Sequence, residues 1–159
     1  MQSLLLSVSD IDTKLKFSVD RNEGEDLLDK LCGLYQSVII FFNRNMTNEV
    51  LVEPMQWLEM TSGVERIIAE NQVKELKALL EETHSYLDPF KAELLVRITV
   101  LKELLATAES NINEVNITGI KNFVAQHIGL VDGWEERFER EKKIFYHRYL
   151  SIISRMTES

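Results

Sequence analysis

Few residues of this 159-residue chain have the types and spacing that metal binding or catalysis requires. Glu81 and His84 form one Glu-x-x-His pair, which is half of the ligand set of a di-iron carboxylate site in a helical bundle. A complete site needs a second such pair, and neither His127 nor His147 has a glutamate three residues before it. We therefore predict no metal site, and we expect His84 to face solvent or to cap a helix.

The single cysteine, Cys32, is the one thiol nucleophile that the sequence offers. A catalytic thiol needs exposure and an activating base, and the adjacent Leu31 and Gly33 supply no base. We interpret Cys32 as a buried structural residue. The sequence also lacks a glycine-rich phosphate loop, a Gly-x-Ser-x-Gly turn and a His-Glu-x-x-His motif. We therefore predict no catalytic residues, no cofactor and no enzyme activity.

Two long segments have the clearest helical pattern. Asp88 suits the N-cap and Pro89 the first turn of a helix over residues 89–111, and Asp132 can cap a second helix over residues 133–156. Apolar residues recur at steps of three and four in both segments, which places them on one face of each helix. They are Phe90, Leu94, Ile98, Leu101, Leu105, Ala108 and Ile112 in the first, and Trp134, Phe138, Phe145, Tyr149, Ile152 and Met156 in the second.

A third helix, predicted over residues 25–44, becomes apolar on all sides from Val38 onward. Such a segment is buried in the middle of a bundle or covered by a partner. We therefore name Ile40, Phe41 and Phe42 as the candidate self-association residues. The β-branched residues also permit a strand over 38–42, but we prefer a helix because the flanking patterns are helical.

The segment 49–83 is expected to form two helices with a break at residues 61–63. Ser62 offers an N-cap there, and Glu65 three residues later completes a capping-box pattern. The apolar face of the second helix is then predicted to contain Val64, Ile67, Ile68, Val73, Leu76, Leu79 and Leu80.

Residues 3–19 fit two structures. Leu4, Val8, Ile11, Leu15 and Val19 recur at helical steps, whereas residues 14–19 alternate between polar and apolar as a half-buried strand does. A two-stranded hairpin alone is marginally stable, so it would have to pack on the helices. We favour the helix and keep the hairpin as the alternative.

A shorter helix over residues 117–130, separated from the last one by Gly129 and Gly133, completes the pattern. We predict an all-α fold, a single antiparallel bundle of five to seven helices, with a small N-terminal β-hairpin as the alternative first element. No linker rich in Ser, Gly or Pro divides the chain, so residues 1–159 are expected to form one domain.

Hydropathy bears on where the protein works. The longest unbroken run of aliphatic and aromatic residues is five, at 38–42, which is too short for a transmembrane helix. The first residues carry no positive charge and make a poor signal peptide. The expected location is therefore cytoplasmic.

Charge is distributed unevenly along the chain. The net charge of −8 disfavours nucleic acid and anionic membranes as partners. Residues 46–85 hold eight acids and three bases, whereas residues 137–155 hold six bases and two acids. The acidic segment would steer toward a basic protein surface. Its candidate partner-binding residues are Glu49, Glu53, Trp57 and Glu59, because tryptophan is enriched among residues that dominate binding energy.

The sequence thus favours a non-enzymatic interaction protein, a small acidic adaptor, regulator or inhibitor that binds another protein. One alternative is a self-associating assembly subunit, with a homodimer seam at residues 38–42. The other is a helical bundle that binds a small molecule or metal in a pocket near Cys32, Tyr35, His84 or His127.

Overall fold

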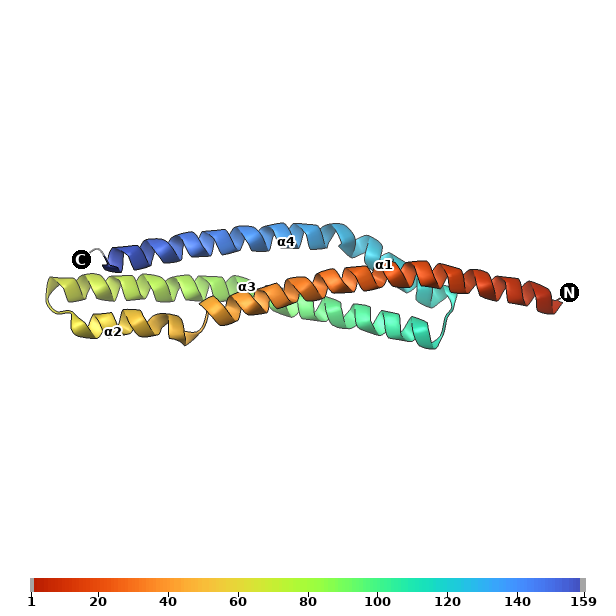
Figure 1. Ribbon diagram of the computed structural model, residues 1–159, viewed down its shortest axis with the longest axis horizontal. Helices are drawn as coiled ribbons and strands as arrows, with labels where there is room; N and C mark the ends of the chain where they lie inside the picture. The colour runs from red at the N-terminus through yellow and green to blue at the C-terminus, as the bar shows by residue number, and fades with distance from the viewer. Residues whose placement is uncertain (1, 158–159) are drawn as a thin grey trace. The chain divides into compact units, whose positions relative to one another are not determined.

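A computed structural model describes the backbone of residues 2–157, and the side chains of residues 12–47 and 49–155. Four α-helices and one short 3₁₀ helix follow one another along the chain (Figure 1). They are α1 (Gln2–Asn45), η1 (Asn48–Leu51), α2 (Val52–Met60), α3 (Val64–Ser110) and α4 (Glu114–Thr157). No strand occurs within residues 2–157.

The fold is therefore an all-α bundle of three long helices of 44, 47 and 44 residues, with one short helix between the first two. The predicted bundle of five to seven helices is wrong in its number of helices. The alternative N-terminal hairpin is also wrong, because residues 3–19 lie within α1. The strand alternative for 38–42 fails for the same reason, and the preferred helix is correct there.

Contacts within the chain divide it into two compact units. Unit 1 consists of Met1–Tyr35 with Glu93–Glu135, and unit 2 of Gln36–Ala92 with Glu136–Ser159. Each long helix supplies a segment to both units. In unit 1 the end of α3 and the start of α4 form a helical hairpin, and in unit 2 α2 and the start of α3 form another (Figure 1). The single domain over residues 1–159 stays a prediction.

Buried positions repeat every seven residues along α3 and α4, which explains why these helices are longer than predicted. The repeat contains Val73, Leu80, Leu87, Leu94, Leu101 and Ala108 on α3, and Ile117, Val124, Val131, Phe138, Phe145 and Ile152 on α4. A sustained seven-residue apolar repeat is typical of long helices packed side by side, as in coiled coils.

Pro89 lies inside α3 and does not begin a helix. The predicted start at Asp88 and Pro89 is therefore wrong, and the second half of 49–83 and the segment 89–111 are parts of one helix. Proline removes the N–H that would bond to the carbonyl of Ser85, which costs about 3 kcal/mol in a helix interior. The helix continues because Leu87 and Leu94, on either side of the exposed proline, are both core residues.

The predicted boundary between 117–130 and 133–156 is also wrong. Gly129 and Gly133 are exposed residues within α4, and the buried repeat passes between them at Val131. Each glycine in a helix interior costs only about 1 kcal/mol relative to alanine. A burial pattern that continues in the same frame outweighs that cost.

The expected break at residues 61–63 is confirmed, and a second break follows the predicted helix 89–111, at residues 111–113. At the first, Gly63 has a φ of 67°, a conformation that favours glycine, and α3 starts directly after it. Gly63 thus holds the position before the helix that was expected for Ser62. At the second, Asn113 Oδ1 accepts a hydrogen bond of 2.8 Å from the backbone N–H of Asn116, which caps α4.

Gly24 lets the three helices of unit 1 approach closely. It is buried on α1 in the same seven-residue repeat as Phe17, Leu31 and Val38. A Cβ atom there would lie 3.0 Å from Leu105 Cδ2 and 3.1 Å from Ile120 Cγ2. The absence of a side chain is thus what allows α3 and α4 to pack against this part of α1.

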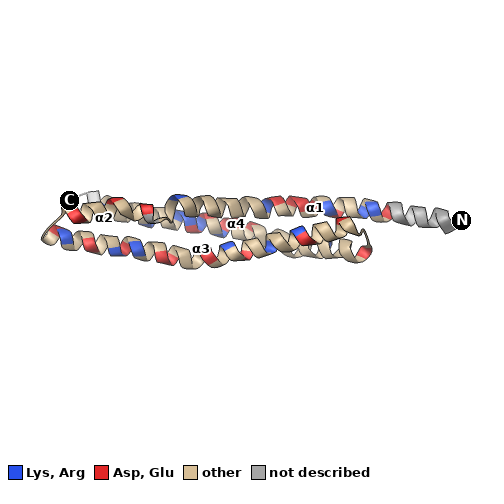
Figure 2. Cartoon of the chain, turned by 90° about the horizontal axis from the view of Figure 1, so that it is seen from below, with Lys and Arg blue, Asp and Glu red and all other residues tan. Residues whose placement is uncertain are grey.

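Within the described residues, no helix is both long enough and apolar enough to cross a membrane. The long helices instead carry charged residues at intervals along their length (Figure 2).

Replacing Pro89 with alanine should stabilise the protein. Pro89→Ala restores the missing backbone donor, so we expect the free energy of unfolding to rise by about 1–3 kcal/mol. Urea denaturation followed by circular dichroism measures it. As a control, Ala106→Pro at an exposed position of the same helix should lower that free energy by about 3 kcal/mol. No gain from Pro89→Ala would show that α3 is built around the proline.

Candidate interaction surface

The predicted partner-binding residues lie on η1 and α2. Glu49 is on η1, Glu53 and Glu59 are on α2, and all three side chains are exposed. Trp57 is partly buried, on the side of α2 that also holds the buried Pro54. The structure thus brings the three carboxylates to the outside of this segment, whereas Trp57 contributes to its inner side.

Six large aliphatic side chains near these carboxylates are exposed to solvent. Met60 is 84% exposed, Val64 74% and Ile67 60%, and about half or somewhat less of Val52, Met55 and Ile68 is exposed. Val64, Ile67 and Ile68 are neighbours on the surface of α3, because residues three and four apart on a helix are adjacent. We call the six aliphatic residues, together with Glu49, Glu53, Glu59 and Glu65, the hairpin surface.

Sequence reasoning missed the aliphatic half of this surface. The prediction placed Val64, Ile67 and Ile68 on the buried face of their helix. The predicted burial of Val73, Leu76, Leu79 and Leu80 is confirmed, but the buried face begins at Ala69, so the first five residues of the helix lie outside the core. The seven-residue spacing of the buried residues was the signal in the sequence that distinguishes them from the exposed Val64, Ile67 and Ile68.

The hairpin surface is acidic. Residues 45–65 contain Glu49, Glu53, Glu59 and Glu65 and no lysine or arginine. In Figure 2 the charged positions of α2 are accordingly red. The first base after this segment, Arg66, is paired with Glu70, with 3.4 Å between Arg66 Nε and Glu70 Oε1. Nothing within the segment therefore neutralises its carboxylates.

The predicted self-association residues do not share one surface. Ile40 is 51% exposed, but Phe41 is only 4% exposed. The Phe41 ring makes edge-to-face contacts with Phe138, Phe145 and Tyr146, at centroid distances of 5.9, 5.2 and 5.7 Å. Phe41 is thus a core residue of unit 2.

Phe42 is partly covered by its own chain. Its ring centroid lies 4.6 Å from that of His84, and Lys91 Nζ lies 4.6 Å from the Phe42 centroid. Of the three residues, Ile40 is the one that offers a free aliphatic surface.

The histidine considered for metal binding makes its contacts within unit 2. His84 Nδ1 lies 3.6 Å from Asp88 Oδ2, and its ring packs on Phe42. No group of three side chains within the described residues is arranged to hold a metal ion. Cys32 is partly exposed, whereas a fully buried thiol was expected.

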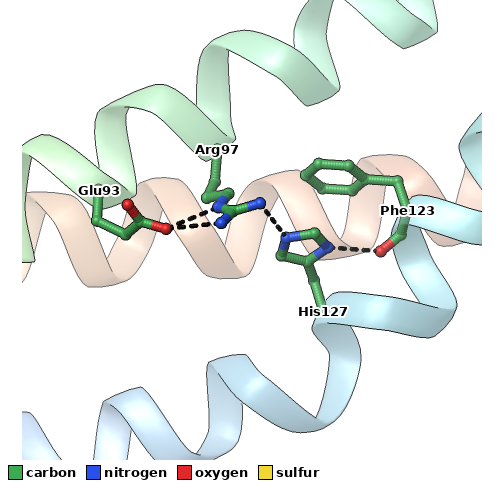
Figure 3. Close-up of polar contacts among 4 residues, drawn as sticks. All are labelled: Glu93, Arg97, Phe123 and His127. Carbon is green, nitrogen blue, oxygen red and sulfur yellow. Dashed lines mark hydrogen bonds and ion pairs between the residues drawn. The ribbon is translucent and has the colours of Figure 1, made fainter.

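A polar chain in unit 1 was not foreseen from the sequence. His127 on α4 is only 2% exposed, and its Nδ1 lies 2.8 Å from the backbone oxygen of Phe123 (Figure 3). Its Nε2 lies 3.2 Å from Arg97 Nη1 on α3. Arg97 in turn places Nε and Nη2 at 2.9 and 2.8 Å from Oε1 of Glu93 (Figure 3).

These contacts determine the protonation of His127. A backbone carbonyl only accepts hydrogen bonds and a guanidinium only donates them. Nδ1 therefore donates to the Phe123 oxygen, and Nε2 accepts from Arg97. The Phe123 ring stacks on the imidazole at a centroid distance of 3.9 Å. The contact between His127 and Arg97 thus joins α4 to α3 in unit 1.

Tyr86 in unit 2 has a buried hydroxyl with no hydrogen-bond partner. Its ring stacks on Phe90 at 5.8 Å, and the Arg137 guanidinium lies 4.8 Å above it. Burial raises the pKa of the Tyr86 phenol, and this effect exceeds the opposing influence of Arg137. The neutral hydroxyl is therefore the form that the fold accommodates.

An open groove of about 610 Å³ lies between α1 and α4 in unit 1. Leu15, Val19, Ile117 and Lys121 are among its lining residues, and none of the residues named for a small-molecule pocket lines it.

Comparisons with protein families, with curated proteins and with solved structures find no match to this chain.

Removing the Arg97 donor should destabilise unit 1. In Arg97→Met the buried Nε2 of His127 loses its partner, so we expect the free energy of unfolding to fall by about 1–3 kcal/mol. Glu93→Gln, which alters only the exposed end of the chain, should cost less than about 1 kcal/mol. Denaturation measures both, and ¹⁵N spectra of the His127 ring report the tautomer. A ring protonated at Nε2 in the wild type would contradict the assignment.

Removing the Tyr86 hydroxyl should be tolerated. Because that group has no partner, Tyr86→Phe should leave the free energy of unfolding unchanged or raise it by up to about 1 kcal/mol. The raised pKa means that the contribution of Tyr86 is complete below the usual tyrosine pKa and is lost as pH rises through the folded-state value. The variant should therefore lose less stability than the wild type above about pH 10.

The matched control for this substitution is Tyr146→Phe. The Tyr146 hydroxyl accepts a hydrogen bond of 3.1 Å from Asn45 Nδ2, so its removal should cost up to about 1 kcal/mol. Equal losses from both substitutions would contradict the distinction between the two hydroxyls.

Proposed function

We propose that this protein is a non-enzymatic interaction module, an adaptor, regulator or inhibitor, whose hairpin surface binds another protein. The observation that carries the proposal is the concentration of six exposed aliphatic side chains beside four carboxylates on η1, α2 and the start of α3. Exposed apolar residues that gather in one part of a protein are typical of interaction sites.

The hydrophobic part of this surface would supply most of the affinity. Burying one aliphatic side chain of this size is worth about 1.5–3 kcal/mol. Met60, Val64 and Ile67 are the most exposed of the six, so they have the most surface to lose to a partner. They lie on both sides of the turn at 61–63.

The carboxylates would select the partner. Glu49, Glu53 and Glu59 are exposed, and no base accompanies them in residues 45–65. Charges at the rim of an interface mainly accelerate association and exclude partners of like charge. The expected partner therefore presents a basic surface with apolar residues. Nucleic acid and anionic membranes are disfavoured because their phosphates would be repelled. We also propose that the protein works in the cytoplasm, as expected from the sequence.

Reversal of the three carboxylates tests the proposal. The triple variant Glu49→Lys, Glu53→Lys and Glu59→Lys should recover the bound protein from cell lysate at least about tenfold less than the wild type. Capture by the wild type should weaken with added salt, because the exposed charges become screened. Quantitative mass spectrometry of the captured proteins measures both effects.

A control of equal charge separates position from net charge. Glu103, Glu109 and Glu114 are exposed residues of unit 1, and their reversal to lysine changes the net charge by the same amount. This control should capture the same protein as the wild type. In addition, the double variant Met60→Ser and Ile67→Ser should weaken capture with no change in charge. If the triple variant captures the same proteins as the control, the hairpin surface is not the binding site.

A further inference from the structure

The outer face of α4 in unit 2 has a composition complementary to that of the hairpin surface. Arg140, Lys143, Ile144, His147 and Leu150 recur at steps of three and four and are all exposed, so they form one stripe along the helix. We call this the α4 stripe. It combines basic groups with two aliphatic side chains, whereas the hairpin surface combines acidic groups with aliphatic side chains.

The bases of the α4 stripe are available for an external partner. Three arginines of this helix in unit 2 are engaged within the chain: Arg155 Nη2 lies 2.6 Å from Glu75 Oε2, Arg148 is paired with Glu82, and Arg137 covers the Tyr86 ring. Arg140 and Lys143 form no ion pair with any described side chain. Arg140 acts on Tyr86 only through its charge, which lowers the pKa of that phenol.

Glu136 with Arg140 and Glu139 with Lys143 have the spacing of intrahelical ion pairs, but neither pair is formed. Glu139 pairs with Lys142 instead, at 2.8 Å.

The two surfaces also match in length. The residues of α4 from Arg140 to Leu150 span about 15 Å at 1.5 Å per residue. The nine residues of α2 span about 13 Å, and η1 extends that segment in the N-terminal direction. The two segments are therefore of comparable length, and Glu53 and Glu59 offer the opposite charges to Arg140 and Lys143.

We propose that a second copy of this chain occupies the hairpin surface through its α4 stripe. Both surfaces belong to unit 2, so a twofold arrangement lets each copy bind the other with both. Such a dimer is isologous and closed, and it contains two identical contacts. The inference rests on the proposed role of the hairpin surface as a docking surface, and it names one occupant.

This dimer would control access to the hairpin surface. A different protein with a basic amphipathic helix would have to displace the α4 stripe of the second copy. Self-association and partner binding are then mutually exclusive, and the concentration of the chain sets how much surface is free.

A charge exchange between two variants tests the proposal. The first variant carries Glu53→Lys and Glu59→Lys, and the second carries Arg140→Glu and Lys143→Glu. Alone, each variant faces like charge at both contacts, so its association should weaken by roughly a hundredfold relative to the wild type. In an equimolar mixture every contact again joins opposite charges, and the mixed dimer should form. Sedimentation velocity at several concentrations measures the association.

A control and a folding check accompany the exchange. Lys102→Glu with Lys121→Glu makes the same charge change at exposed positions of unit 1 and should associate as the wild type does. Circular dichroism confirms that each variant is folded, and only folded variants enter the comparison.

Three outcomes would overturn the inference: a wild type that stays monomeric at all concentrations, a second variant that associates as well as the wild type, and a mixture that does not restore association. None of them concerns the proposed function, because capture of another protein is measured separately on the carboxylate triple variant. Conversely, the triple variant could capture the same proteins as the wild type while the mixed dimer still forms. The hairpin surface would then be a homodimer contact only.

Discussion

The continuous seven-residue repeat of buried side chains is the constraint on which this structure depends. On α4 the repeat runs from Ile117 to Ile152, and on α3 from Val73 to Ala108, with no change of frame. Each step buries one apolar side chain, worth about 1.5–3 kcal/mol. To end a helix inside this repeat, the chain would have to forfeit neighbouring core positions. That cost exceeds the cost of a proline or a glycine in the helix, so the local breakers are overridden.

The same balance explains which parts of the fold could be predicted. The all-α class followed from the apolar periodicity, and the breaks at 61–63 and 111–113 followed from turn-forming residues. None of the residues in these two breaks is buried, so ending a helix there removes no side chain from the core. Pro89 and Gly129 gave equally strong local signals and were misread, because each was weighed against capping rules alone. Comparing the spacing across the breaker, from Leu87 to Leu94 or from Val124 to Val131, identifies the uninterrupted helix.

The candidate surface was predictable only in its charged half. Acidic residues on a short helix are exposed in almost any fold, so Glu49, Glu53 and Glu59 could be named from the sequence. Exposure of Val64 and Ile67 depends on which frame of α3 faces the core, and that is decided by packing. The burial of His127 is likewise a tertiary property. His127 lies seven residues after the buried Ile120, and the contact with Arg97 on α3 makes a histidine acceptable there.

The short helix α2 has too little core to be stable by packing alone, and this connects its structure to its proposed role. Pro54 is its only fully buried residue, and an isolated helix of nine residues is marginal in water. Segments of low local stability are the ones that open first and that change when a ligand binds. A partner on the outer face of α2 would add contacts where the chain supplies few, and would stabilise the folded hairpin by mass action. The exposed aliphatic residues that weaken this segment in the free chain are therefore the same residues that would order it in a complex.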